Sequence, residues 1–420
     1  MLYYLLFVVF LLALCWLLPR IGFVKKSGLP GPLIIGLFVL KVLAGILLGW
    51  LSLHYYGAGN DYWDINREAA KEYALLLQHP GEYFSNIFSS GYDKGYGGVF
   101  DSFNSFWNDL RNNLVIKLVS VFNLLSGGNY YINSLFYNLL VFFGHLGLYR
   151  LFIDIYPAHK WKVLAGTFLL PSTLYFSSGI NRDGLVFLLL ALVVYIIYFA
   201  FRRGQISIGK LCLLLFSMVL LFFLRNYLVL ALLPALAGWW LGRRMGGRKV
   251  FLVYAAVYLA AGLVLFGIHK LLPGVQPLRV IVQKQADYLQ LPASATSIPL
   301  DTLAANPAGF IRNAPQALNH AWLRPYPLEW PSLFLVPMSI ELLVYQLLVL
   351  LFLIRGLRSP QDSMAFLGFC IFFLAGIFLF IGYITPNLGA LVRYRSLLWP
   401  LLITHLLCRI DWNRVGKSLK

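Results

Sequence analysis

Long apolar runs recur from one end of the chain to the other, and shorter polar segments separate them. A helix needs about 20 apolar residues to cross the hydrocarbon layer of a membrane. By this measure the pattern predicts about eleven spanning helices, and hence an all-α polytopic membrane protein whose residues 1–420 form a single transmembrane domain. The predicted spans lie near 2–18, 32–53, 130–151, 163–179, 184–201, 209–224, 226–242, 250–269, 332–354, 364–383 and 396–410.

Composition excludes a water-soluble globule. Of the 420 residues, 60% are hydrophobic and only 12% are charged, whereas soluble domains carry about 25% charged residues. The first apolar run has no basic residue before it and no small-residue cleavage site after it. We therefore interpret residues 1–31 as an additional first span with its cytoplasmic loop, rather than as a signal peptide.

The net charge of +18 agrees with this topology. An excess of basic residues can indicate a nucleic-acid partner, but in multispan proteins these residues gather in cytoplasmic loops and set the orientation. Six basic clusters fall on one side if the N-terminus is external, so we expect membrane lipids and no nucleic acid as partners. The clusters are Arg20/Lys25/Lys26, His159/Lys160/Lys162, Arg202/Arg203/Lys210, Arg243/Arg244/Arg248/Lys249, Arg355/Arg358 and Arg409/Arg414/Lys417/Lys420.

Two long segments are then external, at 54–129 and 270–331. The first carries eight of the 16 acidic residues, among them Asp93 and Asp101. Helices are expected in its parts 66–78 and 110–125, the latter on the membrane surface. The second segment contains nine prolines, which argue against a long helix there. Long loops in a compact protein are usually functional.

The first candidate site is the run Asn60-Asp61-Tyr62-Trp63-Asp64, at the start of the acidic segment. Carboxylates three residues apart share one face of a helix, and one of them can act as a general base at the membrane surface. Tyr62 and Trp63 offer flat apolar faces suited to sugar rings. In the alternative interpretation Asp61 only caps the following helix, and local sequence alone favours that role.

The second candidate is Asp183, in the short external turn Ser177–Gly184. In the functional interpretation its carboxylate joins Asp61 and Asp64 at the outer surface. The alternative is a turn in which Asp183 pairs with the neighbouring Arg182. Charged residues at the rim of a helical bundle are tolerated easily, so position alone does not decide between these interpretations.

Cations on the external side form the third group. Guanidinium groups suit phosphate because they form bidentate, charge-assisted hydrogen bonds. An interfacial arginine can equally bind lipid headgroups without specificity. The candidate phosphate-binding residues are Arg225, Arg393, Arg395, Lys284 and Arg312.

Glu341 lies within the predicted ninth span, where a carboxylate is either functional or paired with an inward-facing arginine such as Arg225. The histidines and the four cysteines show no metal-ligand spacing. Phosphate-binding loops and nucleophile-elbow motifs are also absent. We expect no metal and no cofactor.

In order along the chain, these features resemble the bacterial integral-membrane glycosyltransferases of the GT-C superfamily, which includes lipid A aminoarabinose transferases and protein mannosyltransferases. The resemblance rests on the acidic pair and the following helices, on Pro171-Ser172-x-x-Tyr175 before Asp183, on the succession of 115–128 and 130–152, and on Arg393-Tyr394-Arg395 with Pro400. The chain departs from the family in its Asp-x-x-Asp spacing, its additional first span and its lack of a large C-terminal soluble domain.

The resemblance implies transfer of a sugar, with inversion, from a polyprenyl-phosphate donor to a glycan or lipid acceptor in cell-envelope assembly. Asp61, Asp64 or Asp183 would be the base, and the cations named above would hold the donor phosphate. Tyr62, Trp63 and Tyr394 would contact the sugar. The expected location is the bacterial inner membrane, with the active site facing the periplasm.

Two other classes are compatible with the sequence. A polysaccharide polymerase or ligase, as in O-antigen assembly, would also use a polyprenyl carrier, but would depend on arginines of the second external segment more than on Asp61. A transporter of lipid-linked sugars would show broken spans that meet at mid-membrane, together with internal symmetry. The sequence shows neither feature.

Overall fold

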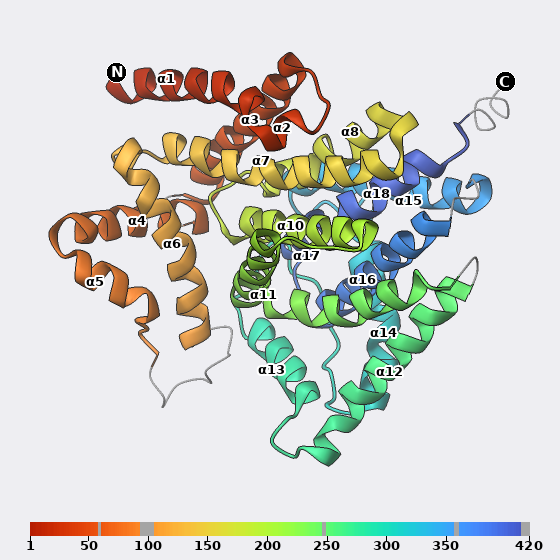
Figure 1. Ribbon diagram of the computed structural model, residues 1–420. Coiled ribbons are helices and arrows are strands. Elements are labelled where there is room, and N and C mark those ends of the chain that lie inside the picture. Colours follow the sequence, from red (N-terminus) through yellow and green to blue (C-terminus); the bar gives the residue numbers. More distant parts are fainter. Residues whose placement is uncertain (58–59, 93–104, 246–248, 357–360, 413–420) are drawn as a thin grey trace. The chain divides into compact units, whose positions relative to one another are not determined.

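The computed structural model describes residues 1–57, 60–92, 105–245, 249–356 and 361–412 (Figure 1). In these residues all the regular secondary-structure elements are helices, and β-pairing is limited to two isolated bridges. The expected all-α class is confirmed. Asp93, Asp101, Arg248, Arg358, Arg414, Lys417 and Lys420, which the sequence analysis assigned to acidic or basic clusters, lie outside the described residues.

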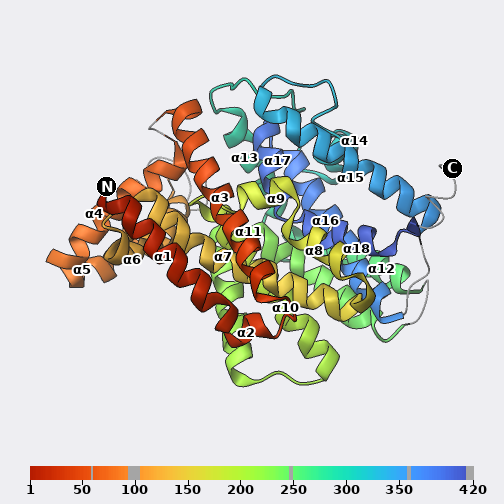
Figure 2. The same cartoon turned by 90° about the horizontal axis from the view of Figure 1, so that it is seen from above.

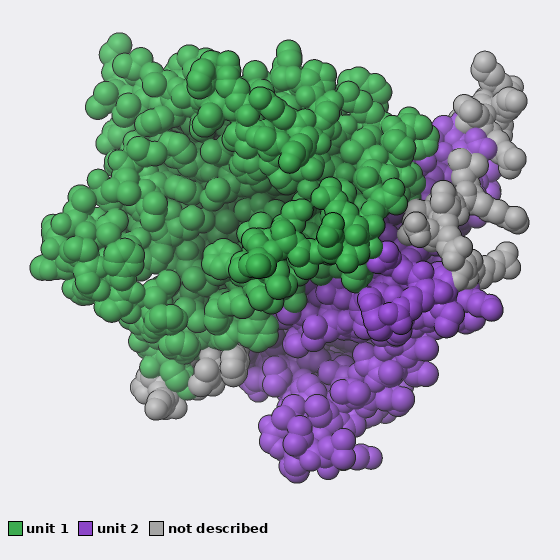
Figure 3. Space-filling model, viewed as in Figure 1, with its two compact units in different colours: residues 1–225 green, residues 226–420 purple. Residues whose placement is uncertain are grey.

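The contacts divide the chain into two compact units (Figure 3), and the single transmembrane domain stays a prediction. Unit 1 is Met1–Arg225 and unit 2 is Asn226–Lys420. Unit 1 contains the first part of α11 (Ile208–Gly242) and the following complete helices: α1 (Leu2–Leu17), η1 (Leu18–Arg20), α2 (Gly22–Lys25), α3 (Gly31–Tyr56), α4 (Asp61–Gln78), α5 (Pro80–Ser85), η2 (Asn86–Phe88), α6 (Phe106–Ser126), α7 (Tyr130–Ile155), η3 (Pro157–His159), α8 (Lys160–Phe168), α9 (Pro171–Phe176) and α10 (Arg182–Arg203).

Helices α7 and α10 pack against each other and run in the same direction. Near their starts, Leu185 N donates to the Tyr137 hydroxyl at 3.1 Å. Near their ends, Arg202 Nε lies 3.0 Å from Asp154 Oδ2. Parallel neighbours require the chain between them to return, so residues 156–181 run back along α7.

Two short helices, α8 and α9, make this return where the sequence predicts one span at 163–179. A proline, which cannot donate the next intrahelical hydrogen bond, begins α9. His145 Nδ1 lies 2.6 Å from Thr167 O, and Asn138 Nδ2 donates to Ser178 O at 2.9 Å. The segment therefore follows α7 from its end toward its start.

Helices α4, α5, η2 and α6 form a lobe at one end of this bundle, which we call the lobe end. Helices α1 and α7 begin at the lobe end, and α3 ends there. Tyr3, near the start of α1, lies beside Gly127, and Gly49, near the end of α3, lies against Tyr130 at the start of α7. Gly127 and its neighbour Gly128 have positive φ, which allows the tight turn from α6 into α7. In Figure 1 α6 runs across the direction of α7, and the N-terminus lies on the lobe side in Figures 1 and 2.

The opposite end of unit 1, the basic end, carries η1, α2, the start of α8 and the end of α10. Arg150 Cζ lies over the ring of Phe23 in α2, 4.5 Å from the ring centre. The ring centres of Phe23 and of Tyr195 in α10 are 5.6 Å apart. Three basic clusters predicted to share one side of the membrane thus lie at one end of unit 1. Their residues at this end include Arg20, Lys25, Lys26, Lys160, Lys162, Arg202 and Arg203.

Helix α11 covers the two spans predicted at 209–224 and 226–242. Arg225 interrupts it with φ −153° and ψ 80°, far from helical values. The sequence analysis placed the boundary between two separate spans at Arg225, whereas the structure has a single α11 with its break at this residue. Breaks of this kind inside apolar helices often occur where neighbouring groups satisfy the freed backbone.

Unit 2 is organised around α16, against which α12, α13, α14 and α18 pack. Its Tyr383 hydroxyl donates to Phe310 O at 2.6 Å, and Phe378 packs on Trp322 with ring centres 4.7 Å apart. These contacts join α16 to α14. Besides the second part of α11, the helices of unit 2 are α12 (Lys249–Leu271), α13 (Pro277–Leu289), α14 (Pro307–Trp322), η4 (Leu333–Leu335), α15 (Val336–Arg355), α16 (Gln361–Ile384), α17 (Leu388–Ser396) and α18 (Trp399–Arg409).

The expectation that prolines prevent a long helix in 270–331 is wrong for α14, which has 16 residues. Pro307 and Pro277 occupy first-turn positions of α14 and α13, where no N–H donor is needed. Pro315 lies inside α14.

Eight helices in the described part of the chain are long and apolar enough to cross a membrane. Three differences separate this number from the eleven predicted spans. The range 163–179 is divided between α8 and α9, the ranges 209–224 and 226–242 share α11, and the range 396–410 corresponds to α18, which has only 11 residues.

Candidate functional site

Asn60, rather than Asp61, caps α4. The Asn60 side-chain oxygen accepts hydrogen bonds from Tyr62 N and Trp63 N, both at 3.2 Å. Its amide nitrogen donates to Ser52 O at 3.2 Å, which ties the cap to the end of α3. Asp61 is therefore the first residue of α4, and its side chain is exposed.

Asp64 pairs with Arg67, one turn further along α4. The two side chains are 44% and 50% exposed, respectively. Exposed pairs of this kind contribute little to stability, about 0–1 kcal/mol. The pair gives Asp64 a local partner without fixing it to another helix.

The two aromatic residues after Asp61 dock α4 onto the bundle. A Cβ placed on Gly179 would stand 2.6 Å from Tyr62 Cε1, so the Tyr62 ring lies directly on this glycine. Trp63 stacks on Tyr130 with ring centres 4.3 Å apart, and its Nε1 donates to Gly49 O at 3.0 Å. Tyr62 therefore brings Asp61 close to the turn that precedes α10.

Lys41 of α3 holds the beginning of this turn. Its Nζ donates to Ser177 Oγ at 2.9 Å, to Ser178 Oγ at 3.1 Å and to Ser177 O at 3.4 Å. These three acceptors all lie in the turn before α10. Lys41 is 1% exposed, so its amino group is held inside the helical bundle.

Side chains of α7 hold the same turn from the other side. Asn138 Nδ2 donates to Ser178 O, as described above, and the Tyr137 hydroxyl donates to Asn181 O. His145 Nε2 lies 3.4 Å from Ser177 Oγ. The backbone from Ser177 to Asn181 is thus fixed by α3 and α7 together.

Asp183 and Arg225 form an ion pair directly after this turn. The carboxylate is 1% exposed and the Arg225 side chain 11%. The structure thus joins one candidate base and one candidate phosphate ligand. Arg225 pairs with Asp183, whereas the sequence analysis considered it as a partner of Glu341.

In unit 2, Glu341 accepts a hydrogen bond from the Tyr345 hydroxyl and lies close enough to Arg395 to stabilise its charge. Arg395 is 1% exposed. Its Nη1 donates to Ala321 O at 2.9 Å and to Arg324 O at 2.6 Å. Arg395 therefore anchors the end of α14.

The remaining predicted residues of unit 2 divide into two places. The Tyr394 hydroxyl lies 3.1 Å from that of Tyr288 on α13, and Lys284 is one turn before Tyr288. Arg393 and Lys284 are both half-buried. Arg312 lies on α14 and is exposed, and its neighbours in sequence are not among the predicted site residues.

A second polar cluster in unit 2 lies outside the spanning helices. Arg324 pairs with Glu329, and its Nη1 lies 3.3 Å from His320 Nε2. Burial alone would raise the pKa of Glu329, but the hydrogen bonds from Arg324 and from Tyr326 N outweigh it and lower the pKa. Burial lowers the pKa of His320, and the Arg324 charge adds to this effect.

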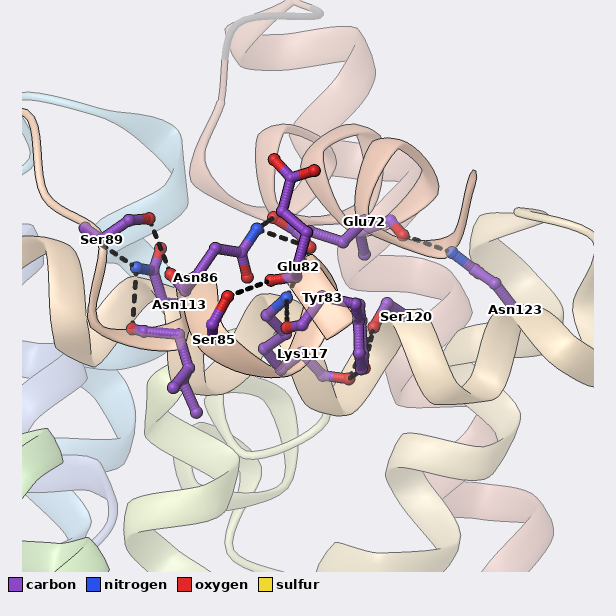
Figure 4. Close-up of polar contacts among 12 residues, drawn as sticks. Glu72, Glu82, Tyr83, Ser85, Asn86, Ser89, Asn113, Lys117, Ser120 and Asn123 are labelled. Carbon is purple, nitrogen blue, oxygen red and sulfur yellow. Dashed lines mark hydrogen bonds and ion pairs between the residues drawn. The ribbon is translucent and has the colours of Figure 1, made fainter. Parts of the chain in front are cut away.

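The lobe has its own polar core, shown in Figure 4. Lys117 of α6 donates to Glu72 of α4 and to Tyr83 O, each at 2.5 Å. Asn86 donates to the same carboxylate at 3.0 Å, and the Tyr83 hydroxyl lies 2.8 Å from Ser120 Oγ. These contacts join α4, α5 and α6, so the lobe is an organised support for Asp61 at the start of α4.

The lobe is also tied to the bundle. Asn133 of α7 donates to Asn66 at 2.8 Å and to Asn123 at 2.6 Å. Asn66 in turn donates to Gly128 O at 3.0 Å. These buried amides connect both long lobe helices to the start of α7.

Sequence reasoning did not identify Lys41, Tyr137, Asn138 or His145. Lys41 was detectable as a single charge inside an apolar run, which is a default signal for a functional or structural role in a membrane helix. The partners of Lys41 are 136 and 137 residues away in sequence. Nothing in one sequence indicates such pairs.

No protein-family model, curated protein or solved structure matches this chain. Among the described residues, no group of three or more His, Cys, Asp and Glu side chains is arranged to hold a metal ion.

Proposed function

We propose that this chain is an integral-membrane glycosyltransferase that moves a sugar from a polyprenyl-phosphate donor to an acceptor at the lobe end of unit 1. One observation carries the proposal. Tyr62 packs on the turn before α10, so the exposed Asp61 and the buried Asp183–Arg225 pair belong to one region at one end of the bundle. Carboxylates and a guanidinium are the groups that such a transfer needs.

The proposed reaction assigns each group a task. The acceptor hydroxyl oxygen forms a bond with the anomeric carbon, and the bond from this carbon to the phosphate oxygen breaks. The phosphate leaves with the bonding electrons, and Arg225 stabilises its charge. The hydroxyl proton passes to a carboxylate, for which Asp61 and Asp183 are the proposed acceptors, with Asp64 as a neighbouring carboxylate on α4.

Charge distribution supports an external position for this site. In unit 1 three of the predicted basic clusters lie at the end opposite to the lobe. Basic ends of membrane bundles face the cytoplasm. The lobe and the Asp183–Arg225 pair would then face outward, toward the periplasm if the membrane is a bacterial inner membrane.

A polysaccharide polymerase or ligase is the second candidate. The observation that favours it is the contact between α13 and α17, where the Tyr288 and Tyr394 hydroxyls lie 3.1 Å apart, with Lys284 one turn before Tyr288 and Arg393 beside Tyr394 in sequence. In that function these residues would hold the carrier phosphate, and Asp61 would be dispensable.

The product released from the carrier distinguishes these functions. The full-length protein in lipid nanodiscs is incubated with polyprenyl-linked lipids extracted from the membranes of its own host, and the lipids are identified by mass spectrometry. A transferase that uses a monophosphate donor releases free polyprenyl monophosphate, and this release is lost in Arg225→Ala. Release of polyprenyl diphosphate instead would favour the polymerase. Release of neither by the wild-type protein would contradict both.

A further inference from the structure

The Asp183–Arg225 pair unites two groups with different tasks in the proposed reaction. Arg225 Nη2 contacts Asp183 Oδ1, so this nitrogen and this oxygen are engaged with each other rather than with a substrate. The closed pair is therefore a resting arrangement, which must open before Arg225 can offer this nitrogen to a phosphate and Asp183 can offer this oxygen to a substrate proton.

We propose that Arg225 exchanges Asp183 for the phosphate of the lipid donor, so that donor binding itself releases the carboxylate. This inference rests on the proposed function and deepens it, because it makes the availability of the base depend on the presence of the donor. Phosphate is a suitable competitor, since it accepts the same bidentate hydrogen bonds from a guanidinium as a carboxylate does.

The two partners differ in how firmly they are held. Asp183 follows a turn that is held by Lys41, Asn138 and Tyr137. A Cβ on Gly184, the residue after Asp183, would stand 2.8 Å from Tyr137 Cε1, so the start of α10 also has no space to shift toward α7. Asp183 is a fixed point.

Arg225, in contrast to Asp183, has freedom to move. Its backbone is the non-helical point of α11, so a change of φ and ψ there does not have to break a regular helix. Its side chain is the more exposed partner, 11% against 1% for Asp183. The partner that a ligand reaches first is therefore the arginine, and the exchange proceeds by movement of Arg225 while Asp183 stays in place.

The exchange also explains how a buried carboxylate becomes a base. When Arg225 binds the donor phosphate, Asp183 Oδ1 loses its contact with Arg225 Nη2 and becomes available to accept a proton. The acceptor hydroxyl supplies that proton as it attacks the anomeric carbon. Asp183 thus becomes reactive only when the donor phosphate is bound to Arg225.

Binding of undecaprenyl monophosphate to the full-length protein in nanodiscs tests this exchange, with undecaprenol, which lacks the phosphate, as the reference lipid. Because Asp183 competes with phosphate for Arg225, Asp183→Asn should bind undecaprenyl monophosphate about tenfold more tightly than the wild type. Arg225→Ala should lose most of the preference for the phosphate over the alcohol. Asp154→Asn is the matched control, because it removes a carboxylate paired with Arg202 at the basic end and should bind like the wild type.

Equal or weaker phosphate binding by folded Asp183→Asn would overturn the exchange, although a wild-type preference for the phosphate would still support the proposed function. No wild-type preference for phosphate over alcohol would contradict the proposed function itself. If Asp183→Asn does not fold, hydrogen exchange on the wild-type protein decides. Saturating undecaprenyl monophosphate, but not undecaprenol, should change amide exchange at residues 222–225 and leave residues 177–183 unchanged. No change at 222–225 would overturn the exchange.

Discussion

Asp183 and Arg225 are 42 residues apart in sequence and form a buried ion pair at the lobe end of unit 1. Helix α10 leads away from this end, and the first part of α11 returns to it. The pair therefore closes an antiparallel helical hairpin at the point where α11 breaks. Its position next to the turn that receives Tyr62 makes it the centre of the proposed site.

Removing one member of this pair should strongly destabilise the protein. Asp183→Asn leaves the Arg225 charge buried without its carboxylate, and losses of this kind are about 3–5 kcal/mol. Replacing both, as Asp183→Asn with Arg225→Gln, should recover part of the loss because no charge is then buried. Thermal unfolding in one detergent measures all variants. Asp154→Asn, whose carboxylate is 32% exposed, should cost less than about 1 kcal/mol. A single variant as stable as the wild type would contradict the buried pair.

Gly179→Ala should separate α4 from the turn before α10. The new methyl group would stand 2.6 Å from Tyr62 and 2.7 Å from Leu48, too close for either to remain in place. Overpacking of this kind typically costs about 1–3 kcal/mol. Gly36→Ala on α3 is the control, since no atom lies within 4 Å of its Cβ. Unfolding temperatures should fall only for Gly179→Ala, and equal values for both variants would refute the contact.

Lys41→Met should loosen the Ser177–Ser178 turn without adding a charge or much volume. Because the three hydrogen bonds from Nζ disappear, amides 178–185 should exchange with solvent deuterium faster than in the wild type. Ser52→Ala on the same helix removes a hydroxyl that donates only within α3, to Gly49 O, and should leave these amides unchanged. Equal protection in Lys41→Met and wild type would show that Lys41 does not hold the turn.

The proposed orientation can be tested in intact cells. In a variant without the four natural cysteines, Ser90→Cys and Leu300→Cys should react with a membrane-impermeant thiol reagent, because both positions lie in segments predicted to be external. Ile206→Cys, between α10 and α11 at the basic end, should react only after permeabilisation. The reverse labelling pattern would invert the topology and place the proposed site in the cytoplasm.

Apolar runs were sufficient to predict the helical class and most spans, because a helix in lipid must be apolar over its whole length. They were insufficient where helices break. The chain at 163–179 carries no charged residue, yet the structure divides it into α8 and α9, and Pro171 begins α9. Arg225 separates the runs 209–224 and 226–242 in sequence, but the sequence does not show that the chain continues there as one kinked helix.

The candidate site was partly predictable for a similar reason. Asp61, Asp183 and Arg225 were visible as charges at the ends of apolar runs. Their grouping was not, because Tyr62 meets Gly179 across more than 100 residues of sequence. Arg395, like Arg225, was a candidate phosphate-binding residue in the sequence, but in the structure it donates hydrogen bonds to carbonyl groups at the end of α14.

The most direct test of the central claim is the profile of polyprenyl-phosphate-linked sugars in host cells that lack this chain. The proposed transferase consumes such a donor, so its loss should cause one lipid-linked sugar to accumulate, as measured by mass spectrometry of membrane lipids. Wild-type protein and Asp154→Asn should restore the normal profile, whereas Asp61→Asn and Asp183→Asn should not, although each is present in the membrane. A profile that does not change when the chain is removed, or that both Asp61→Asn and Asp183→Asn restore, would contradict the account.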